Sequence, residues 1–141
     1  MEINFRHSSP IQIRFNDVDM LGHATNSVYP QYFDLGRMAY FESVLGERMD
    51  WRFDGLIMVS ISIDFVAQVK LYDTVFVRTK IIRLGNKSLD MVQDIFNETT
   101  GKVVAKSKGV MVGYNGADEA SIPIPTRWRE RIAAFESDVL F

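Results

Sequence analysis

One segment of the chain has the periodicity of a long helix and is apolar on more than one side. From about Ser27 to Leu45, aromatic and small residues recur at steps of three and four, which places them on one helical face. Asn26 or Ser27 is predicted to cap the first amides, with Pro30 in the first turn and Gly46 ending the helix. The periodic positions are Tyr29, Phe33, Gly36, Tyr40 and Val44. Because other faces are apolar too, the sequence predicts a helix surrounded by other structure.

Almost all of the remaining chain has the character of β-strands. Between Ile57 and Ala67 the odd positions are apolar, which is the period of a half-buried strand. Short connections that contain Gly predict hairpins and therefore an antiparallel sheet. The predicted strands are 11–15, 57–67, 74–84, 88–97 and 103–114, and a short helix is predicted at 126–135. The sequence thus predicts an α+β fold, with the long helix across the concave face of a curved antiparallel sheet of about five strands. The open edges of such a sheet favour pairing with a second copy.

The composition excludes several classes of protein. The chain has 141 residues, which fits a single domain, 1–141. Its net charge of −2 argues against a nucleic-acid partner. It has no Cys and only two His, so we expect no thiol nucleophile, no metal centre and no cofactor. The sequence has neither an apolar run of membrane-spanning length nor a signal-peptide pattern, so we expect no membrane partner and a cytoplasmic location.

A crowded polar turn at 16–26 immediately precedes the predicted helix and contains two carboxylates, Asp17 and Asp19. The first amides of a helix have no partner within the helix and carry a partial positive charge. A carboxylate beside them stays ionised as a base or nucleophile, and the amides can stabilise an oxyanion. The turn is therefore a candidate acyl-transfer site. Polar residues also serve simply to close turns, and this physical argument does not choose between the two Asp.

The stretch from Arg14 to Arg37 resembles the signature of hotdog-fold acyl-CoA thioesterases. It reads RFNDVDMLGHATNSVYPQYFDLGR and follows the pattern R-x-x-D-x-D-x-x-G-H-x-x-N-x-x-Y-x-x-Y-F-x-x-x-R of the 4-hydroxybenzoyl-CoA thioesterase-like branch. The resemblance implies the hotdog fold, a long helix wrapped by a curved sheet, and hydrolysis of an acyl-CoA thioester to a carboxylic acid and free CoA. It also implies a homodimer, or a dimer of dimers, with active sites at the interface of two subunits.

The resemblance assigns roles to residues of the turn and of the helix start. The second carboxylate of the pair, Asp19, takes the catalytic role, and Gly22 is the glycine of the active-site turn. Asn26 stands where some members of the family have Tyr or His, so its backbone N–H, rather than its side chain, is expected to polarise the thioester carbonyl. Tyr29 matches the helix tyrosine that follows. His23 either binds water or holds the turn together.

The same resemblance places the CoA portion of the substrate near a later hairpin. Arg83, Lys87 and Ser88 bracket this hairpin, where the family often has cations that meet the nucleotide. Lys106 and Lys108 are alternatives on the next strand. Lysines on hairpins are more often simply solvated.

Two other functions remain open. Because a fold does not fix a function, a non-catalytic hotdog module that binds acyl-CoA or an acyl chain is the main alternative. A hotdog-fold dehydratase acting on hydroxyacyl thioesters is a third possibility. The dehydratase branch resembles this chain less, because the turn at 16–26 follows the thioesterase pattern. Release of free thiol from acyl-CoA separates hydrolysis from binding.

Overall fold

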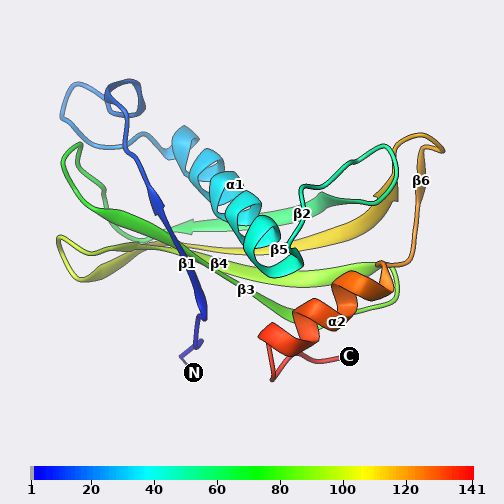
Figure 1. The fold of residues 1–141 in the computed structure, drawn as a ribbon. Helices are drawn as coiled ribbons and strands as arrows, with labels where there is room; N and C mark the ends of the chain where they lie inside the picture. The colour runs from blue at the N-terminus through cyan, green and yellow to red at the C-terminus, as the bar shows by residue number, and fades with distance from the viewer. Residues whose placement is uncertain (1) are drawn as a thin grey trace.

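The computed structural model describes residues 2–141 and consists of a curved antiparallel sheet with one long helix on its concave face (Figure 1). The sheet has the strand order β1-β3-β4-β5-β2, and the short β6 extends it beside β5. The predicted α+β architecture is confirmed. No helix within residues 2–141 is long and apolar enough to cross a membrane. The helices are α1 (Tyr29–Tyr40) and α2 (Thr126–Phe135), and the strands are β1 (His7–Ile11), β2 (Gly55–Phe65), β3 (Val75–Leu84), β4 (Ser88–Asn97), β5 (Lys102–Asn115) and β6 (Ala120–Ser121).

The long helical segment is continuous but changes its helix type along its length. A 3-10 turn at Asn26–Val28 leads into α1, and a π-helical turn at Phe41–Leu45 follows it. Gly46 then ends the segment with a φ of +70°, a left-handed conformation that suits glycine. The helix predicted from Ser27 to Leu45 is therefore confirmed, and so is its terminating glycine.

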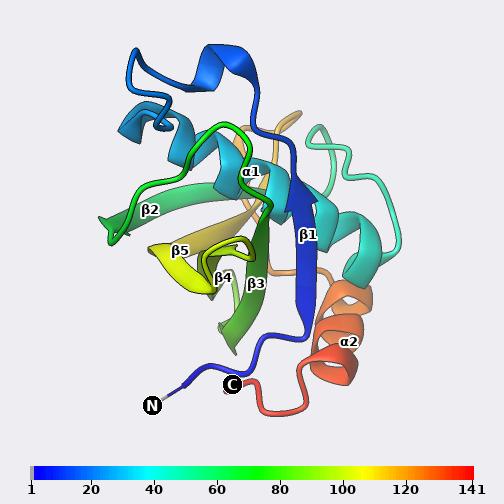
Figure 2. The same ribbon diagram turned by 90° about the vertical axis from the view of Figure 1, so that its left-hand side faces the viewer.

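The core fills the space between α1 and the curved sheet (Figure 2). One cluster lies at the C-terminal end of the helical segment, where Trp128 and Ile132 of α2 close the end of the sheet. A second cluster lies at the N-terminal end, where Tyr29 and Phe33 pack on β3, β4 and β5. Helix α2 contributes to the first of these clusters only.

The predicted strand at 11–15 is wrong in its position. The strand of this region is β1, and residues Phe15–Asp17 form a 3-10 turn instead. The reason is local: the side chain of Asp17 accepts a hydrogen bond from the N–H of Arg14 at 2.9 Å, which folds the chain back on itself. Phe15 is consequently 80% exposed, although the alternating pattern placed it on the apolar face.

Strand β2 begins earlier than predicted and contains an irregularity. Its register with β5 shifts between Met58 and Ser60, which is the mark of a β-bulge. Before the shift, Leu56 points into the core and is 1% exposed. The apolar odd positions predicted for 57–67 therefore share one face only after the bulge, because the extra residue changes the phase of the alternation.

Gly36 marks the closest approach of α1 to β3. A Cβ on Gly36 would lie 2.4 Å from Cγ1 of Val77, whose β-branched side chain is fully buried. We expect Gly36→Ala to lower the free energy of unfolding by about 1–3 kcal/mol through overpacking, although Ala has the better helix propensity by about 1 kcal/mol. Urea unfolding measures this change. The control Gln31→Ala, on the exposed face of α1, should stay within about 0.5 kcal/mol of the wild type. Equal losses in the two variants would contradict the close approach.

Candidate active site

The polar turn at 16–26 is held against the loop that connects β2 to β3. The N–H of Ala24 donates to the carbonyl of Val69 at 2.7 Å, and the N–H of Leu71 donates to the carbonyl of Gly22 at 3.2 Å. Figure 1 shows the two loops together at the end of the sheet nearest the start of α1. The turn therefore has a fixed position relative to both the helix and β2.

Asp19 lies in this turn with an exposed side chain. Its Oδ1 accepts hydrogen bonds from the N–H of Leu21 at 2.9 Å and from the N–H of His23 at 3.2 Å. Gly22 lies between these two donors with a φ of +76°, which glycine adopts without strain. The turn thus fixes one oxygen of the Asp19 carboxylate. The other oxygen, Oδ2, has no hydrogen-bond partner among residues 2–141.

The start of the helical segment leaves backbone donors free. The N–H of Val28 donates to the carbonyl of Thr25 at 3.1 Å, whereas those of Asn26 and Ser27 have no backbone acceptor within the described chain. The predicted caps are wrong, because no side chain of residues 2–141 caps either the 3-10 turn or α1. The hydroxyl of Ser27 instead lies 3.0 Å from that of Thr25. The uncapped amides carry the positive end of the helix dipole and remain available to an oxygen atom of a ligand.

An open groove of about 460 Å³ joins the carboxylate to the helix start. Its walls come from the polar turn, from the first residues of the helical segment and from the end of β2 with the loop after it. Four of the five turn and helix residues predicted for the site line it, and Gly22 lies in the turn behind them. The lining residues are Asp19, His23, Ala24, Thr25, Asn26, Tyr29, Phe65, Val66, Ala67 and Gln68.

Tyr29 forms part of the inner wall of the groove and is 2% exposed. Its ring packs edge-on against Phe65, with centroids 5.3 Å apart, and against Tyr32 at 6.1 Å. Burial raises the pKa of Tyr29, and a backbone hydrogen bond with Val69 offsets part of that rise. Tyr29 is therefore protonated at neutral pH, and its packing makes this wall largely aromatic.

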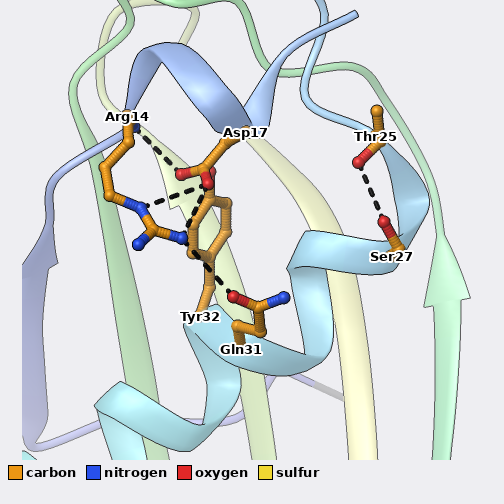
Figure 3. A network of polar contacts seen from close by, with 6 residues as sticks. All are labelled: Arg14, Asp17, Thr25, Ser27, Gln31 and Tyr32. Carbon is orange, nitrogen blue, oxygen red and sulfur yellow. Dashed lines mark hydrogen bonds and ion pairs between the residues drawn. The ribbon is translucent and has the colours of Figure 1, made fainter.

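Asp17 is buried, does not line the groove and belongs to a different network (Figure 3). Its carboxylate accepts hydrogen bonds from the N–H of Arg14, from the Arg14 guanidinium at 3.0 Å and from the hydroxyl of Tyr32 at 2.8 Å. Burial alone would raise the pKa of Asp17, but the bonds from Arg14 and Tyr32 outweigh it and lower the pKa below its ordinary value. The bonds from Arg14 close the turn itself and the bond from Tyr32 ties it to α1, so Asp17 has the surroundings of a structural residue.

Replacing Asp17 by Asn is expected to destabilise the fold at neutral pH by about 2 kcal/mol, the scale of hydrogen bonds to a buried charge. Because the pKa of Asp17 is lowered on folding, its stabilising contribution is present above the ordinary pKa of an Asp. That contribution is lost as the pH falls through the folded-state value. The difference between wild type and variant should therefore shrink below about pH 4. Urea unfolding of both proteins at pH 7 and pH 3 measures it, and a difference independent of pH would contradict this role.

Arg37, the last residue of the signature, also serves the fold. It is buried, and its guanidinium donates to Oε1 of Gln93 at 2.9 Å and pairs with Asp34. The amide nitrogen of Gln93 in turn donates to the carbonyl of Phe33 and to the hydroxyl of Thr79. This chain of polar contacts fastens the middle of α1 to β3 and β4, about where Gly36 touches the sheet.

The hairpin predicted to meet CoA lies at the other end of the sheet from the groove (Figure 1). It connects β3 to β4, beside α2, and the guanidinium of Arg129 donates to the carbonyl of Gly85 there. Arg83 is paired with Asp90 at 2.8 Å and bonds the hydroxyl of Ser88 at 3.2 Å. Within one chain, therefore, Arg83, Lys87 and Ser88 are not brought together with Asp19.

The alternative cations, Lys106 and Lys108, do not line the groove either. Both line a separate hollow of about 740 Å³, together with the N-terminal segment and residues of β2, β3 and β4. Within residues 2–141, no group of three or more His, Cys, Asp or Glu side chains is placed to hold a metal ion.

The sequence did not identify the residues that complete the groove on the side of the sheet. Phe65, Val66 and Gln68 read there as the end of a strand, and nothing in their alternation indicates a ligand. Phe65 is 47% exposed and Val66 is 58% exposed. Two neighbouring apolar residues exposed at the end of a strand indicate a binding surface, but their exposure is known only once the chain is folded.

The architecture and the groove define a hotdog-fold protein with a carboxylate beside an uncapped helix start. A family model described as the thioesterase-like superfamily matches residues 13–134. The chain belongs to this superfamily, so the predicted family is confirmed, and with it the enzyme class of thioesterases. The search among curated proteins gave no match.

Solved structures agree with this membership. The chain is similar to a thioesterase from Thermus thermophilus complexed with coenzyme A and Zn, at 31% identity, a TM-score of 0.80 and coverage of 94% of this chain and 96% of that one. It is similar to a predicted thioesterase from Bacillus stearothermophilus at 28% identity, a TM-score of 0.79 and coverage of 94% and 95%. A 1,4-dihydroxy-2-naphthoyl-CoA thioesterase from Synechocystis shares the fold, at 17% identity, a TM-score of 0.78 and coverage of 92% and 96%.

Proposed function

We propose that the protein hydrolyses an acyl-CoA thioester to a carboxylic acid and free CoA in the groove at the start of α1. One observation carries this proposal: a carboxylate oriented by backbone amides, Asp19, lines the same groove as Asn26, the first residue of the helical segment, whose N–H has no backbone acceptor within residues 2–141. Membership of the thioesterase-like superfamily and the coenzyme A bound to the Thermus relative support it.

In the proposed reaction the thioester carbonyl accepts hydrogen bonds from the N–H groups at Asn26 and Ser27. As its carbon becomes tetrahedral, its oxygen gains negative charge, which the amides and the helix dipole stabilise. The C–S bond then breaks, and the sulfur leaves as the CoA thiolate and takes up a proton. Neither step requires a Ser or Cys.

Asp19 has one of two roles in this scheme. As a general base it takes a proton from water while the water oxygen attacks the carbonyl carbon. As a nucleophile its Oδ2 attacks that carbon directly, and water then hydrolyses the mixed anhydride to release the acid. In both cases Oδ1 stays bound to the amides of Leu21 and His23, which keep the carboxylate oriented.

We also propose that the working enzyme is a homodimer joined along the free edge of β2. Among residues 2–141 the strand lies at the end of the sheet order and is paired only with β5, so its outer backbone groups have no partner in the sheet. Two copies related by a two-fold axis would pair antiparallel. The hairpin that carries Lys87 would then lie on the same side as the partner's groove.

A second reading uses the same residues for binding alone. The two backbone bonds to Asp19 Oδ1 are also those of a carboxylate that only closes a turn. A non-catalytic module of this kind would bind acyl-CoA in the groove without turning it over.

Thiol release from a panel of aliphatic and aromatic acyl-CoAs, followed with a thiol reagent, tests the proposed function. We expect turnover with at least one member of the panel. Calorimetry with the same compounds measures binding separately. Tight binding of acyl-CoA without any release of thiol would favour the binding module, and absence of both would refute the proposal.

A further inference from the structure

The loop between the helical segment and β2 presents two aromatic side chains to solvent. Trp51 is 49% exposed and Phe53 is 57% exposed. The indole N–H of Trp51 donates to the carbonyl of Leu56 at 2.9 Å, which holds the ring against the start of β2. Figure 1 shows this loop on the same side of the sheet as α1, at the end away from the groove.

The loop is firmly anchored, so the exposure of these aromatic rings is built into the fold. The N–H of Gly116 donates to the carbonyl of Trp51 at 2.8 Å, and the N–H of Ala117 donates to that of Arg52 at 3.0 Å. The guanidinium of Arg127 in α2 pairs with Asp54 at 2.8 Å. Large apolar side chains held in water at fixed positions are a mark of an interaction surface.

A second pair of exposed apolar residues lies at the opposite end of the same strand. Phe65 ends β2, Val66 follows it, and both line the sheet side of the groove. Strand β2 therefore has one apolar pair at each end, and its outer edge is free between them. If two copies pair antiparallel along this edge, the end that carries Trp51 in one copy lies beside the end that carries Phe65 in the other.

This arrangement is self-complementary, which is the requirement for a two-fold interface. The other free edge of the sheet, β1, is much shorter than β2 and contains Pro10, which cannot donate a backbone hydrogen bond. The occupant that fits the edge of β2 is therefore a second copy of this chain.

We propose that Trp51 and Phe53 of one subunit close the groove of the partner subunit and contact the acyl group of its substrate. This inference rests on the proposed function and on the proposed dimer. In the completed site, the helix amides and Asp19 hold the thioester. Phe65 and Val66, with the aromatic rings of the partner's loop, enclose an apolar acyl group. The loop is thus a specificity determinant that acts across the interface.

The first test measures binding and does not require turnover. Its probes are CoA and S-octyl-CoA, a thioether that cannot be hydrolysed. Phe53→Ser is expected to weaken binding of S-octyl-CoA by roughly 10-fold or more, the scale of a lost apolar contact, and to leave binding of CoA unchanged. The control Phe141→Ser removes a side chain that is 78% exposed at the C-terminus, beside β3, and should leave the ratio of the two affinities unchanged. Equal affinity of Phe53→Ser and wild type for S-octyl-CoA would overturn the inference.

The second test asks which subunit the loop serves. A heterodimer of one Asp19→Asn subunit and one Phe53→Ser subunit is purified through two different tags. If the loop acts across the interface, one site has both an intact Asp19 and the partner's intact Phe53, so activity recovers to about half that of the wild-type dimer. If the loop acts within its own subunit, neither site is intact, and activity stays near that of the parents.

The outcomes separate the two proposals. Absence of turnover by the wild type, together with the expected loss of S-octyl-CoA affinity, would refute hydrolysis and leave the inference standing. Normal turnover without recovery in the heterodimer would refute the inference alone. If Phe53→Ser fails to dimerise, Phe53→Ala and Trp51→Leu provide the same comparison. If each of these variants forms a heterodimer with Asp19→Asn and none recovers activity, the inference is refuted.

Discussion

Replacing Asp19 by Asn is expected to lower kcat by at least about 10²-fold, the usual scale for losing a general base. The amide oxygen of Asn can still accept the hydrogen bonds from Leu21 and His23, so the turn should keep its shape. What the variant loses is the charge and basicity of the oxygen that faces the groove. Thiol release under saturating acyl-CoA measures kcat, and thermal unfolding establishes that the variant is folded.

Asp17→Asn is the matched control for this measurement, because it makes the same chemical change two residues upstream. Its carboxylate is buried in contacts with Arg14 and Tyr32, so its loss should reduce stability more than kcat. A folded Asp19→Asn protein with near-normal turnover would refute the proposed mechanism. A collapse of kcat confined to Asp17→Asn would move the catalytic role to that residue.

The second large effect is expected from a charge placed in the middle of β2. Ile61 is 42% exposed on the face of the sheet that carries α1. In the proposed dimer the middle of β2 lies beside its own counterpart, so Ile61→Lys brings two positive charges together near the two-fold axis. Light scattering should give a mass near twice 16.2 kDa for the wild type and near 16.2 kDa for the variant.

The same variant should lose activity, because each groove lacks its partner. We expect kcat/KM to fall by about 10²-fold, the size of effect that follows when reacting groups are displaced from their productive geometry. Phe141→Lys makes a comparable change on an exposed side chain far from β2 and should keep both mass and activity. A wild-type protein that is monomeric and fully active would refute both the dimer and the inference that depends on it.

Elements whose pattern is local and repeated were predicted well from the sequence. The helical segment, the three long hairpin strands β3, β4 and β5, and α2 all lie within a few residues of their predicted positions. Their hydrophobic periods are long enough to average over individual residues. The errors at β1 and β2 have local causes. At β1, the hydrogen bond from the N–H of Arg14 to the side chain of Asp17 folds residues that were predicted as strand into a turn. At β2, a bulge shifts the alternation of apolar residues by one position.

The candidate site was predicted only in part, for a related reason. Asp19, His23, Asn26 and Tyr29 are close in sequence, so a turn followed by a helix brings them together by itself. The assignment of a role to Asp19 came from the family resemblance and stays a proposal. Phe65 and Val66 come from the end of β2 and the loop after it, nearly forty residues after Tyr29, and the hairpin with Lys87 lies at the other end of the sheet.

By itself, the sequence determined the kind of elements in this protein, their order, the family and the short segment that carries the carboxylate and the helix start. These are properties of neighbouring residues, set by backbone geometry and hydrophobic period. Only the tertiary structure decided that Asp17 is buried while Asp19 faces the groove, because two residues of spacing do not fix orientation once the chain turns between them. It also decided which wall faces the helix amides and which strand keeps a free edge, since both depend on how distant segments pack around α1.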